Sequence, residues 1–511
     1  MKALQMQRSL SRVSYGHRGA VKARIEDIDS FSDFPLLSVI QESIPAEALK
    51  GLVDISPTPV QRLAIPALLG SGEKTGRGTL AVDPGQGMKQ FLLAAETGSG
   101  KTLAYLLPTL DAIKRAELEE AAGEARHKAA KVEKKKSSLF ELESPPLSNQ
   151  PLTSAGRPRA IVLLPTSELV DQVGSIFKTF SHTIKLRVSL ISAAYSARVI
   201  RNRLFGPGGV DVIIATPHLL GSIAESDPNI LSRVTHLIID EADSLLDRSF
   251  APLTSAILDR ATPSLKQLIL CSATIPRSLD TYLEKRFPDI QRLATPNLHA
   301  IPRRVQLGVV DIDRDPYRGN RDLACADSIW SIGRQAGEHG LEEGADIRER
   351  AEVKRILVFV NEREKAQELA DYLVTKGIDA SAMNRDTSEQ RSGEVLSAFT
   401  STRPATPSDK VLVAEAADKG AGSLQTVNRR ILPNTKVLVM TDLGSRGIDT
   451  VAVRNVILYD VPHTTIDFIH RLGRTGRMGR RGRGIVLVGK DDRRDIVREV
   501  REGMFRGQAL I

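Results

Sequence analysis

One segment of the sequence places glycines, a lysine and a hydroxyl side chain between an apolar run and a helical pattern. It consists of Ala95, Glu96, Thr97, Gly98, Ser99, Gly100, Lys101 and Thr102. Glycines let backbone N–H groups curl around phosphates at a helix N-terminus. We therefore expect Lys101 to reach the β- and γ-phosphates of a nucleotide and Thr102 to bind Mg²⁺. A glycine-rich turn without function is the alternative, and the flanking strand and helix disfavour it.

Two adjacent carboxylates follow a later apolar run, where Asp240 and Glu241 begin the segment 240–243. Phosphoryl transfer depends mainly on positioning and charge neutralisation. Asp240 could hold Mg²⁺, and Glu241 could polarise the attacking water. An acidic helix N-terminus would look similar by itself. Its pairing with the glycine-rich segment favours the catalytic interpretation.

An arginine-rich segment, 470–480, begins with His470 and spaces its arginines with glycines. Guanidinium groups can approach a triphosphate bidentately, so Arg474 and Arg477 are candidates for arginine fingers that one domain delivers to the nucleotide of the other. A plain RNA-binding basic loop is the alternative. It explains the charge but leaves the spacing unexplained.

Unbroken Leu/Ile/Val runs predict the elements that position these residues. Such runs are typical of strands buried on both faces of a parallel sheet. They end in small polar residues and alternate with helical stretches such as 364–377, in this order: 91–102, 160–168, 211–217, 236–243, 268–274, 355–361, 436–442, 455–462 and 484–489. The sequence therefore predicts two tandem α/β domains, with functional groups at the carboxyl ends of the strands.

Composition sets limits on the class of protein. The 511 residues include 71 Lys+Arg and 62 Asp+Glu, and the net charge of +9 favours an anionic partner. Two cysteines, Cys271 and Cys325, cannot form a disulfide framework or a zinc site by themselves, so we expect a reducing compartment. No run approaches 18 apolar residues, which excludes a helical membrane span.

Domain boundaries are predicted from local composition. A basic segment, 1–25, has no acidic residue before Glu26, which is typical of an organelle transit peptide or of a disordered arm that contacts nucleic acid. Domain 1 is expected over 26–297 and domain 2 over 298–511. Three polar stretches are predicted to be surface insertions, because none has enough apolar residues to pack a core: 112–158, 313–353 and 400–434.

The motifs and their order resemble those of the DEAD-box RNA helicases across residues 31–489. The matches are SPTPVQ (56–61), AETGSGKT (95–102), PTSEL (165–169), TP (216–217), DEAD (240–243), SAT (272–274), VFVN (358–361), TDLGSRGID (441–449) and HRLGRTGRMGR (470–480). The resemblance implies two RecA-like domains, ATP and Mg²⁺ as cofactors, and RNA as the partner.

By that resemblance, Gln61 would contact the adenine edge and Asp449 the ribose. Ser272 and Thr274 would couple the ATP site to the domain interface, and His470 would lie near the catalytic water. The remaining motifs would bind RNA through Pro165, Thr166, Thr216, Pro217, Thr441 and Arg446.

Departures from the family pattern lie on the RNA side of domain 1. Ser167 stands where the family has arginine, and His218 and Leu219 replace the glycine and arginine that follow TP. We expect these changes to weaken contacts to the RNA backbone without abolishing binding, because phosphate contacts add roughly independently.

The motif pattern together with the basic N-terminal segment resembles the fungal mitochondrial DEAD-box helicases of large ribosomal subunit assembly. The resemblance implies an RNA-stimulated ATPase that locally unwinds RNA in the mitochondrial matrix. Large-subunit ribosomal RNA and a pre-ribosomal particle would be its partners. It would act as a monomer, and no membrane would be among its partners. An ATP-gated RNA clamp with little unwinding is the alternative, and a DNA helicase fits the motif set less well.

Overall fold

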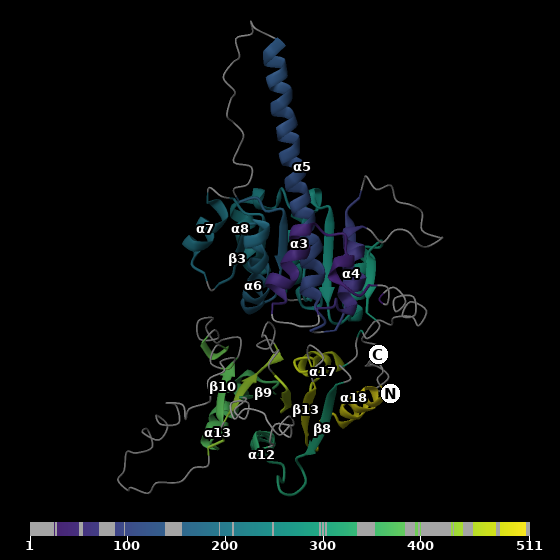
Figure 1. Cartoon of the computed structure of the whole chain (residues 1–511). Helices are drawn as coiled ribbons and strands as arrows, with labels where there is room; N and C mark the ends of the chain where they lie inside the picture. The colour runs from purple at the N-terminus through teal and green to yellow at the C-terminus, as the bar shows by residue number, and fades with distance from the viewer. Residues whose placement is uncertain are drawn as a thin grey trace, which may run out of the picture. The chain divides into compact units, whose positions relative to one another are not determined.

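The computed structural model describes most of the chain and divides it into two compact units (Figure 1). Domain 1 is drawn mainly from residues 12–296 and domain 2 mainly from 297–511. Apart from Thr97 and Ala194, the described residues are 25, 28–50, 55–70, 87–137, 156–206, 209–247, 250–295, 298, 301, 304–334, 353–383, 394–396, 399, 431–432, 434–442, 453–476 and 481–506.

Domain 1 contains a seven-stranded sheet in the order β3-β4-β2-β5-β6-β1-β7, and all of its strand pairs are parallel. Its strands are β1 (Lys89–Ala94), β2 (Ala160–Leu163), β3 (Val188–Ile191), β4 (Val212–Ala215), β5 (His236–Ile239), β6 (Gln267–Ser272) and β7 (Gln291–Ala294). The apolar runs predicted β1, β2, β4, β5 and β6. They did not predict β3 and β7, which are the two edge strands.

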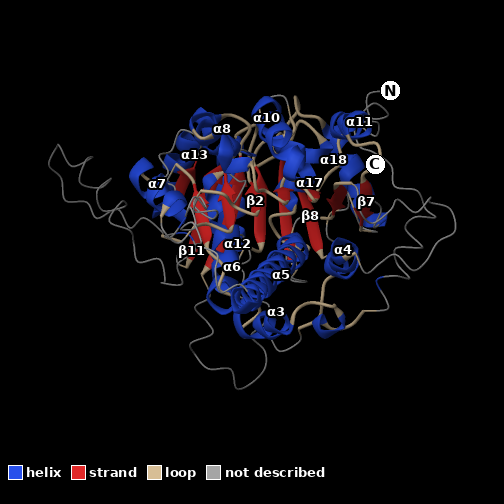
Figure 2. Ribbon diagram, turned by 90° about the horizontal axis from the view of Figure 1, so that it is seen from above, coloured by secondary structure: helices blue, strands red, loops and turns tan. Residues whose placement is uncertain are grey.

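Helices lie on both sides of the strands (Figure 2). Domain 1 has α3 (Ser38–Ser43), α4 (Pro59–Leu69), α5 (Lys101–Ser137), α6 (Ser167–Ile184), α7 (Ala197–Phe205), α8 (Pro217–Ser226), α9 (Ala242–Leu245), α10 (Ala251–Ala261) and α11 (Arg277–Arg286), with short η1 (Phe31–Asp33), η2 (Ile44–Ala48), η3 (Pro228–Leu231) and η4 (Thr262–Ser264). Strand residues such as Val162 and Ile214 are fully buried beneath them. Covered on both faces, a parallel sheet needs the continuous apolar runs seen in the sequence.

The helix that follows β1 is longer than the domain requires. α5 has 37 residues, which corresponds to about 55 Å of helix. Figure 1 shows its C-terminal part rising away from the sheet. Ile113 is still buried in the core, so the expected insertion at 112–158 begins inside the domain. Leu118 is 52% exposed, and the charged segment beyond it continues the same helix.

Domain 2 contains a six-stranded parallel sheet in the order β10-β11-β9-β12-β13-β8. Its strands are β8 (Val305–Asp311), β9 (Lys354–Phe359), β10 (Asp379–Met383), β11 (Thr435–Met440), β12 (Asn455–Leu458) and β13 (Gly482–Val488). Its longer helices are α12 (Arg321–Arg334), α13 (Arg363–Thr375), α17 (Thr465–Leu472) and α18 (Arg494–Arg506). The predicted fold class, two parallel sheets covered by helices, is therefore confirmed.

The structure corrects the interpretation of 313–353 as a surface insertion. α12 occupies 321–334 and buries Ala324, Cys325, Ile329 and Ile332 in the domain 2 core. The stretch is polar by overall composition, but its few apolar and small residues fall on one face of a helix, and that face packs into the core. Both cysteines are free and buried.

Several predictions fall on residues that the structure does not describe. The basic segment 1–24, residues 335–352 and most of 400–434 lie outside the described residues. Leu432, at the end of the third stretch, is buried in the domain 2 core. Within the described chain, no helix combines the length and apolar character needed to cross a bilayer.

Candidate nucleotide and RNA site

Three motifs of domain 1 meet at one edge of its sheet. The glycine-rich loop follows β1, Asp240 follows β5, and Ser272 is the last residue of β6. These strands are neighbours in the order β5-β6-β1, and Ala94 of β1 pairs in register with Ser272. Because parallel strands end at the same edge, the sheet brings together side chains separated by up to 170 residues or so in sequence.

Lys101 is held at the floor of the glycine-rich loop. It is the first residue of α5 and only 8% exposed, and its Nζ donates a hydrogen bond to the Ala95 carbonyl at 2.7 Å. Gly98 and Gly100 have positive φ values of 74° and 92°, which glycine adopts without strain. The loop therefore curls around the lysine at a helix N-terminus, as a phosphate site requires.

Gln61 lies against this loop. It is the third residue of α4, where its Oε1 accepts a hydrogen bond from the Thr58 N–H at 2.9 Å in a capping box. Its Nε2 donates to the Gly100 carbonyl at 3.2 Å. A Cβ on Gly100 would lie 2.7 Å from that Nε2 and would push the amide away, and the φ of 92° would strain any other residue there. The local capping signal thus fixes the side chain beside the loop.

Asp240 is 7% exposed and accepts two hydrogen bonds. Tyr105 donates its hydroxyl to Oδ2 at 3.1 Å, and the Glu241 backbone N–H donates to Oδ1 at 2.9 Å. Burial, reinforced by the Glu241 charge, raises the pKa of Asp240 to about 6, although Lys101 opposes the shift. Burial and the same carboxylate raise the pKa of Tyr105 well above its usual range. The site therefore has more negative charge than its own lysine offsets.

Glu241 has a left-handed backbone, with φ 51° and ψ 49°, and its side chain is only partly buried. This conformation costs a non-glycine residue about 1 kcal/mol or more and is concentrated at functional sites. It turns the chain sharply after β5, so that the neighbouring carboxylates lie in different environments.

Asp243, the third carboxylate of the segment 240–243, accepts a hydrogen bond from the segment that follows β6. The sequence motifs did not predict this role. Thr274 donates its hydroxyl to Asp243 Oδ2 at 2.6 Å. Ser272 donates its own hydroxyl to the Thr274 carbonyl at 2.6 Å, and both side chains are completely buried. The spacing of Asp243 within 240–243 is the signal that could have suggested this partner.

No group of three or more His, Cys, Asp or Glu side chains that could hold a metal lies among the described residues. Two residues remain that could supply oxygen ligands to a metal. They are Asp240, whose charge Lys101 offsets only in part, and Thr102, a hydroxyl residue at the start of α5. Mg²⁺ is usually held by one or two protein oxygens together with substrate phosphates and water. The residues present fit that ion.

On the RNA side of domain 1, two helices begin just after the adjacent strands β2 and β4. Thr166 accepts a hydrogen bond from the Leu169 N–H at 3.4 Å at the N-cap of α6, and Thr216 is the N-cap of α8. Pro165 and Pro217 are buried. Helix N-termini attract phosphates, so the two threonines and the backbone beside them present the accessible donors.

Domain 2 holds a buried arginine that sequence reasoning quoted but gave no role. Arg471 is 1% exposed and donates to both Asp442 oxygens at 2.6 Å and to Asn361 Oδ1 at 2.7 Å. The Asn361 N–H donates to Asp460 Oδ2 at 2.8 Å. The cluster joins the ends of β9, β11 and β12 to α17.

The other predicted residues of domain 2 are only partly described. His470 is half-buried at the end of α17, and Arg474 follows it in a buried position. Thr441 is also buried, so its side chain offers RNA little surface. Arg446, Asp449 and Arg477 lie outside the described residues, as does Thr97 of the loop in domain 1.

A glycine-rich loop, a DEAD segment and a serine-alanine-threonine segment on one parallel sheet, with a second parallel sheet following, define an ATP-dependent RNA helicase fold. The DEAD/DEAH box helicase family matches residues 58–282, and the helicase conserved C-terminal domain matches residues 422–479.

Similar chains agree over the full length. The chain is 62% identical to the mitochondrial ATP-dependent RNA helicase mrh4 of Sclerotinia sclerotiorum, covering 100% of this chain and 82% of that one. It is 57% identical to the protein of the same name from Neurospora crassa, covering 100% and 81%. The chain therefore belongs to the DEAD-box ATP-dependent RNA helicases; it is an enzyme, and its localisation is mitochondrial.

Solved structures show the same fold. Saccharomyces cerevisiae Dbp5 bound to RNA and ADP-BeF3 matches with a TM-score of 0.59 at 19% identity, covering 93% of each chain. Mss116p bound to single-stranded RNA and AMP-PNP matches with a TM-score of 0.61 at 18% identity, covering 93% of this chain and 77% of the other.

Proposed function

We propose that the edge of the domain 1 sheet is the ATP hydrolysis site of this helicase. One observation carries the proposal: Lys101, at the start of α5, and the adjacent Asp240 and Glu241, after β5, come together at the carboxyl ends of neighbouring strands, with two carboxylates and one lysine. Lys101 would bind the β- and γ-phosphates, and Glu241 would position the attacking water. Gln61 would contact the adenine beside Gly100.

We propose that Thr102 and Asp240 hold Mg²⁺ together with the phosphates. When bound, the ion supplies positive charge to the transferring phosphoryl group. A cation beside Asp240 would also offset the burial that raises its pKa, so the carboxylate would be ionised when the nucleotide is bound. His470, Arg474, Arg477 and Asp449 would act on the same nucleotide from domain 2.

RNA is proposed to bind the N-termini of α6 and α8 through the segments 165–166 and 216–217. Thr441 and Arg446 would extend this contact in domain 2, with Thr441 contributing its backbone because its side chain is buried. A bent single strand held in this way cannot remain in an A-form duplex, so a short duplex would lose a strand. Ser272 and Thr274, tied to the DEAD segment through Asp243, would couple ATP to RNA.

A Glu241→Gln substitution tests the site. ATP should still bind, hydrolysis should fall by about 100-fold or more because the water loses its base, and RNA should stay bound in the presence of ATP. ATPase and RNA release are measured together. Glu284→Gln, an exposed position on α11, is the matched control. Release of RNA by the Glu241→Gln protein at the wild-type rate would refute the assignment.

At the level of the cell, we propose a role in assembling the large mitochondrial ribosomal subunit in the matrix. The protein would act as a monomer on large-subunit ribosomal RNA within a pre-ribosomal particle, with residues 1–25 as the transit peptide. The motif pattern and the mitochondrial relatives support this proposal. RNA crosslinking in purified mitochondria should recover large-subunit ribosomal RNA; recovery of messenger RNA alone would refute it.

An ATP-gated clamp remains the second candidate, favoured by one observation. The first turn of α8 carries His218 and Leu219 and no arginine, so domain 1 offers fewer cations to RNA than the family pattern. A strand-displacement assay run beside the ATPase assay separates the two: ATP turnover without displaced strands would favour the clamp.

A further inference from the structure

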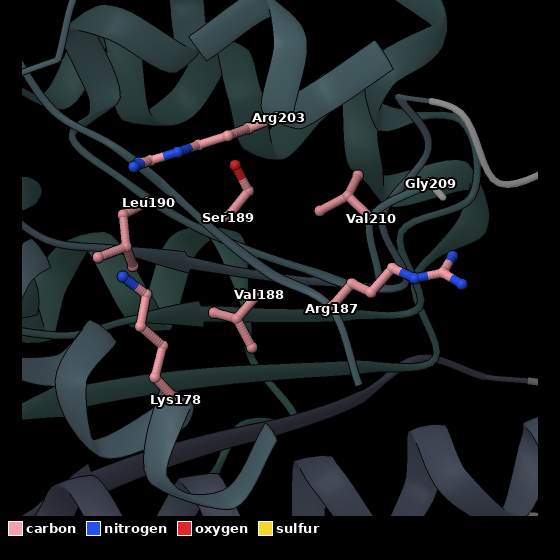
Figure 3. A pocket seen from close by; sticks show the side chains of 8 residues that line it. All are labelled: Lys178, Arg187, Val188, Ser189, Leu190, Arg203, Gly209 and Val210. Carbon is pink, nitrogen blue, oxygen red and sulfur yellow. The ribbon is translucent and has the colours of Figure 1, made fainter. Parts of the chain in front are cut away.

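A cavity of about 300 Å³ opens at the edge strand β3 of domain 1 (Figure 3). Lys178 of α6 and Arg203 of α7 line it together with Ser189 of β3. Arg187, just before β3, and Val210, just before β4, complete its wall. The cavity is thus bounded by three cationic side chains, one hydroxyl group and apolar strand residues.

The cavity lies away from the RNA motifs of domain 1. Arg187 and Val210 precede the amino ends of β3 and β4, whereas Thr166 and Thr216 follow the carboxyl ends of β2 and β4. β3 has four residues and spans about 13 Å. α7 begins after β3 and runs to residue 205, which places Arg203 in its last turn. The cavity is therefore a separate site at the opposite end of the strands.

Its three cations outnumber the one carboxylate found beside them, since Asp211 Oδ2 accepts a hydrogen bond from the Arg187 backbone N–H at 2.9 Å. Lys178, Arg187 and Arg203 are exposed, and none forms a salt bridge with a carboxylate in the described part of the chain. In contrast, Arg159 pairs with Glu120 at 2.6 Å on the same domain. An excess of cations around one concave site produces a local positive potential that attracts anions.

One buried polar group also lacks a partner. Ser189 is 4% exposed, and its Oγ makes no hydrogen bond with any described residue. Figure 3 shows this hydroxyl pointing toward the side where Arg203 lies, whereas the Arg187 guanidinium extends to the other end. The Arg203 guanidinium stacks over the Tyr195 ring at 4.2 Å, which restricts its orientation. A buried hydroxyl without a partner is unfavourable unless a ligand supplies one.

We propose that this pocket binds a backbone phosphate of RNA, as a second RNA contact of domain 1. The RNA would continue to the pocket from the proposed contacts at the N-termini of α6 and α8. Ser189 would donate a hydrogen bond to a phosphate oxygen, while Arg203 and Lys178 would neutralise the charge. α7 also carries Arg198 and Arg201, both exposed, but their spacing from Arg203 places them on another side of the helix, outside the pocket. The inference rests on RNA being the substrate, because RNA held at the motifs of the same domain brings further backbone phosphates near this pocket at a higher effective concentration than a free anion has.

The double variant Lys178→Gln/Arg203→Gln tests the pocket. Affinity is measured in the presence of an ATP analogue for two RNAs. One has about 10 nucleotides and spans only the proposed contacts at α6 and α8; the other has about 30 nucleotides and can also reach the pocket. Each lost phosphate contact should lower the salt slope for single strands by about 0.7, which is about fivefold in affinity at 0.1 M salt. We expect a loss of about 25-fold for the long RNA and none for the short RNA.

The matched control is Arg260→Gln/Lys285→Gln, two exposed cations on α10 and α11. It should leave both affinities unchanged. Equal affinity of the pocket variant and the wild type for long RNA would overturn the proposal, and so would an equal loss for short RNA. Absence of any short-RNA binding by the wild type would instead refute the proposed function.

The hydroxyl and the ligand class have their own tests. Ser189→Ala should weaken long-RNA binding about threefold without lowering the melting temperature, and unchanged affinity would count against the pocket. Calorimetric binding of inorganic phosphate alone that the double variant lacks would reassign the site to a free anion. Displacement of long RNA by polyglutamate, lost in the same variant, would reassign it to an acidic peptide paired along β3.

Discussion

Each domain buries an ionisable side chain beside its sheet, Arg471 in domain 2 and Asp240 in domain 1, and the two domains differ in how they compensate that charge. In domain 2, Arg471 donates to both oxygens of Asp442, its Nη2 also donates to Asn361, and its Nη1 donates to the Asp460 carbonyl, so its charge is neutralised inside the protein. In domain 1, Asp240 has Tyr105 and a backbone N–H as donors, and its pKa is raised to about 6. The domain 2 cluster is therefore closed, whereas the domain 1 cluster is open: its carboxylate has no arginine of its own, and a bound cation is the partner proposed for it.

The largest effect is expected from opening the closed cluster. Arg471→Ala should lower the free energy of unfolding by about 3 kcal/mol, because it removes a fully buried side chain together with its ion pair to Asp442 and its hydrogen bonds to Asn361 and the Asp460 carbonyl. Chemical denaturation measures this change. Arg493→Ala removes an exposed ion pair with Asp495 and should cost less than 1 kcal/mol or so. Equal losses in the two variants would break the distinction.

The stability that depends on Asp240, in the open cluster, should decrease as the pH rises. The pKa of Asp240 is raised from 3.8 to about 6 in the folded protein, so the folded state binds this proton more tightly than the unfolded state. The associated stability is present below pH 4 or so and is lost as the pH rises through about 6, a change of about 3 kcal/mol at most.

Asp240→Asn should therefore unfold at higher denaturant concentration than the wild type at pH 7.5, and this advantage should shrink as the pH falls to about 4. Asparagine keeps an acceptor for Tyr105. A constant difference between the two proteins across this pH range would show that the Asp240 charge is already compensated, as it is for Asp442.

Guanidinium groups added at the predicted RNA motifs of domain 1 should contact RNA. Ser167→Arg with His218→Gly and Leu219→Arg adds two cations at the starts of α6 and α8. The salt slope of single-strand binding should steepen by about 0.7 per contact, with ATP affinity unchanged. An unchanged slope would mean that neighbouring cations such as Arg201 already supply these contacts.

The smallest effect is expected from trimming the open cluster. Tyr105→Phe removes the hydroxyl that donates to Asp240 Oδ2, at a cost of about 1 kcal/mol in the free energy of unfolding. Because that hydrogen bond lowers the pKa of Asp240, the variant should also move the pH transition upward. A transition at lower pH would show that the tyrosine does not stabilise the carboxylate.

The sequence by itself determined the family, the central strands and the ATP motifs. These features are local: a run of Val, Ile and Leu specifies a doubly covered strand, and glycines before Lys101, between a strand pattern and a helix pattern, specify a phosphate loop. The edge strands β3 and β7 escaped prediction because short strands with polar or charged neighbours carry a weak local signal.

Only the tertiary structure decided how distant side chains pair. α12 was predicted to lie on the surface, yet its small residues are buried because the domain 2 sheet offers a face that they fit. The pairing of Arg471 with Asp442, of Thr274 with Asp243, and the gathering of Lys178, Ser189 and Arg203 around one cavity depend on strand order. Strand order follows from the packing of the whole sheet, so composition and spacing along the chain do not encode it locally.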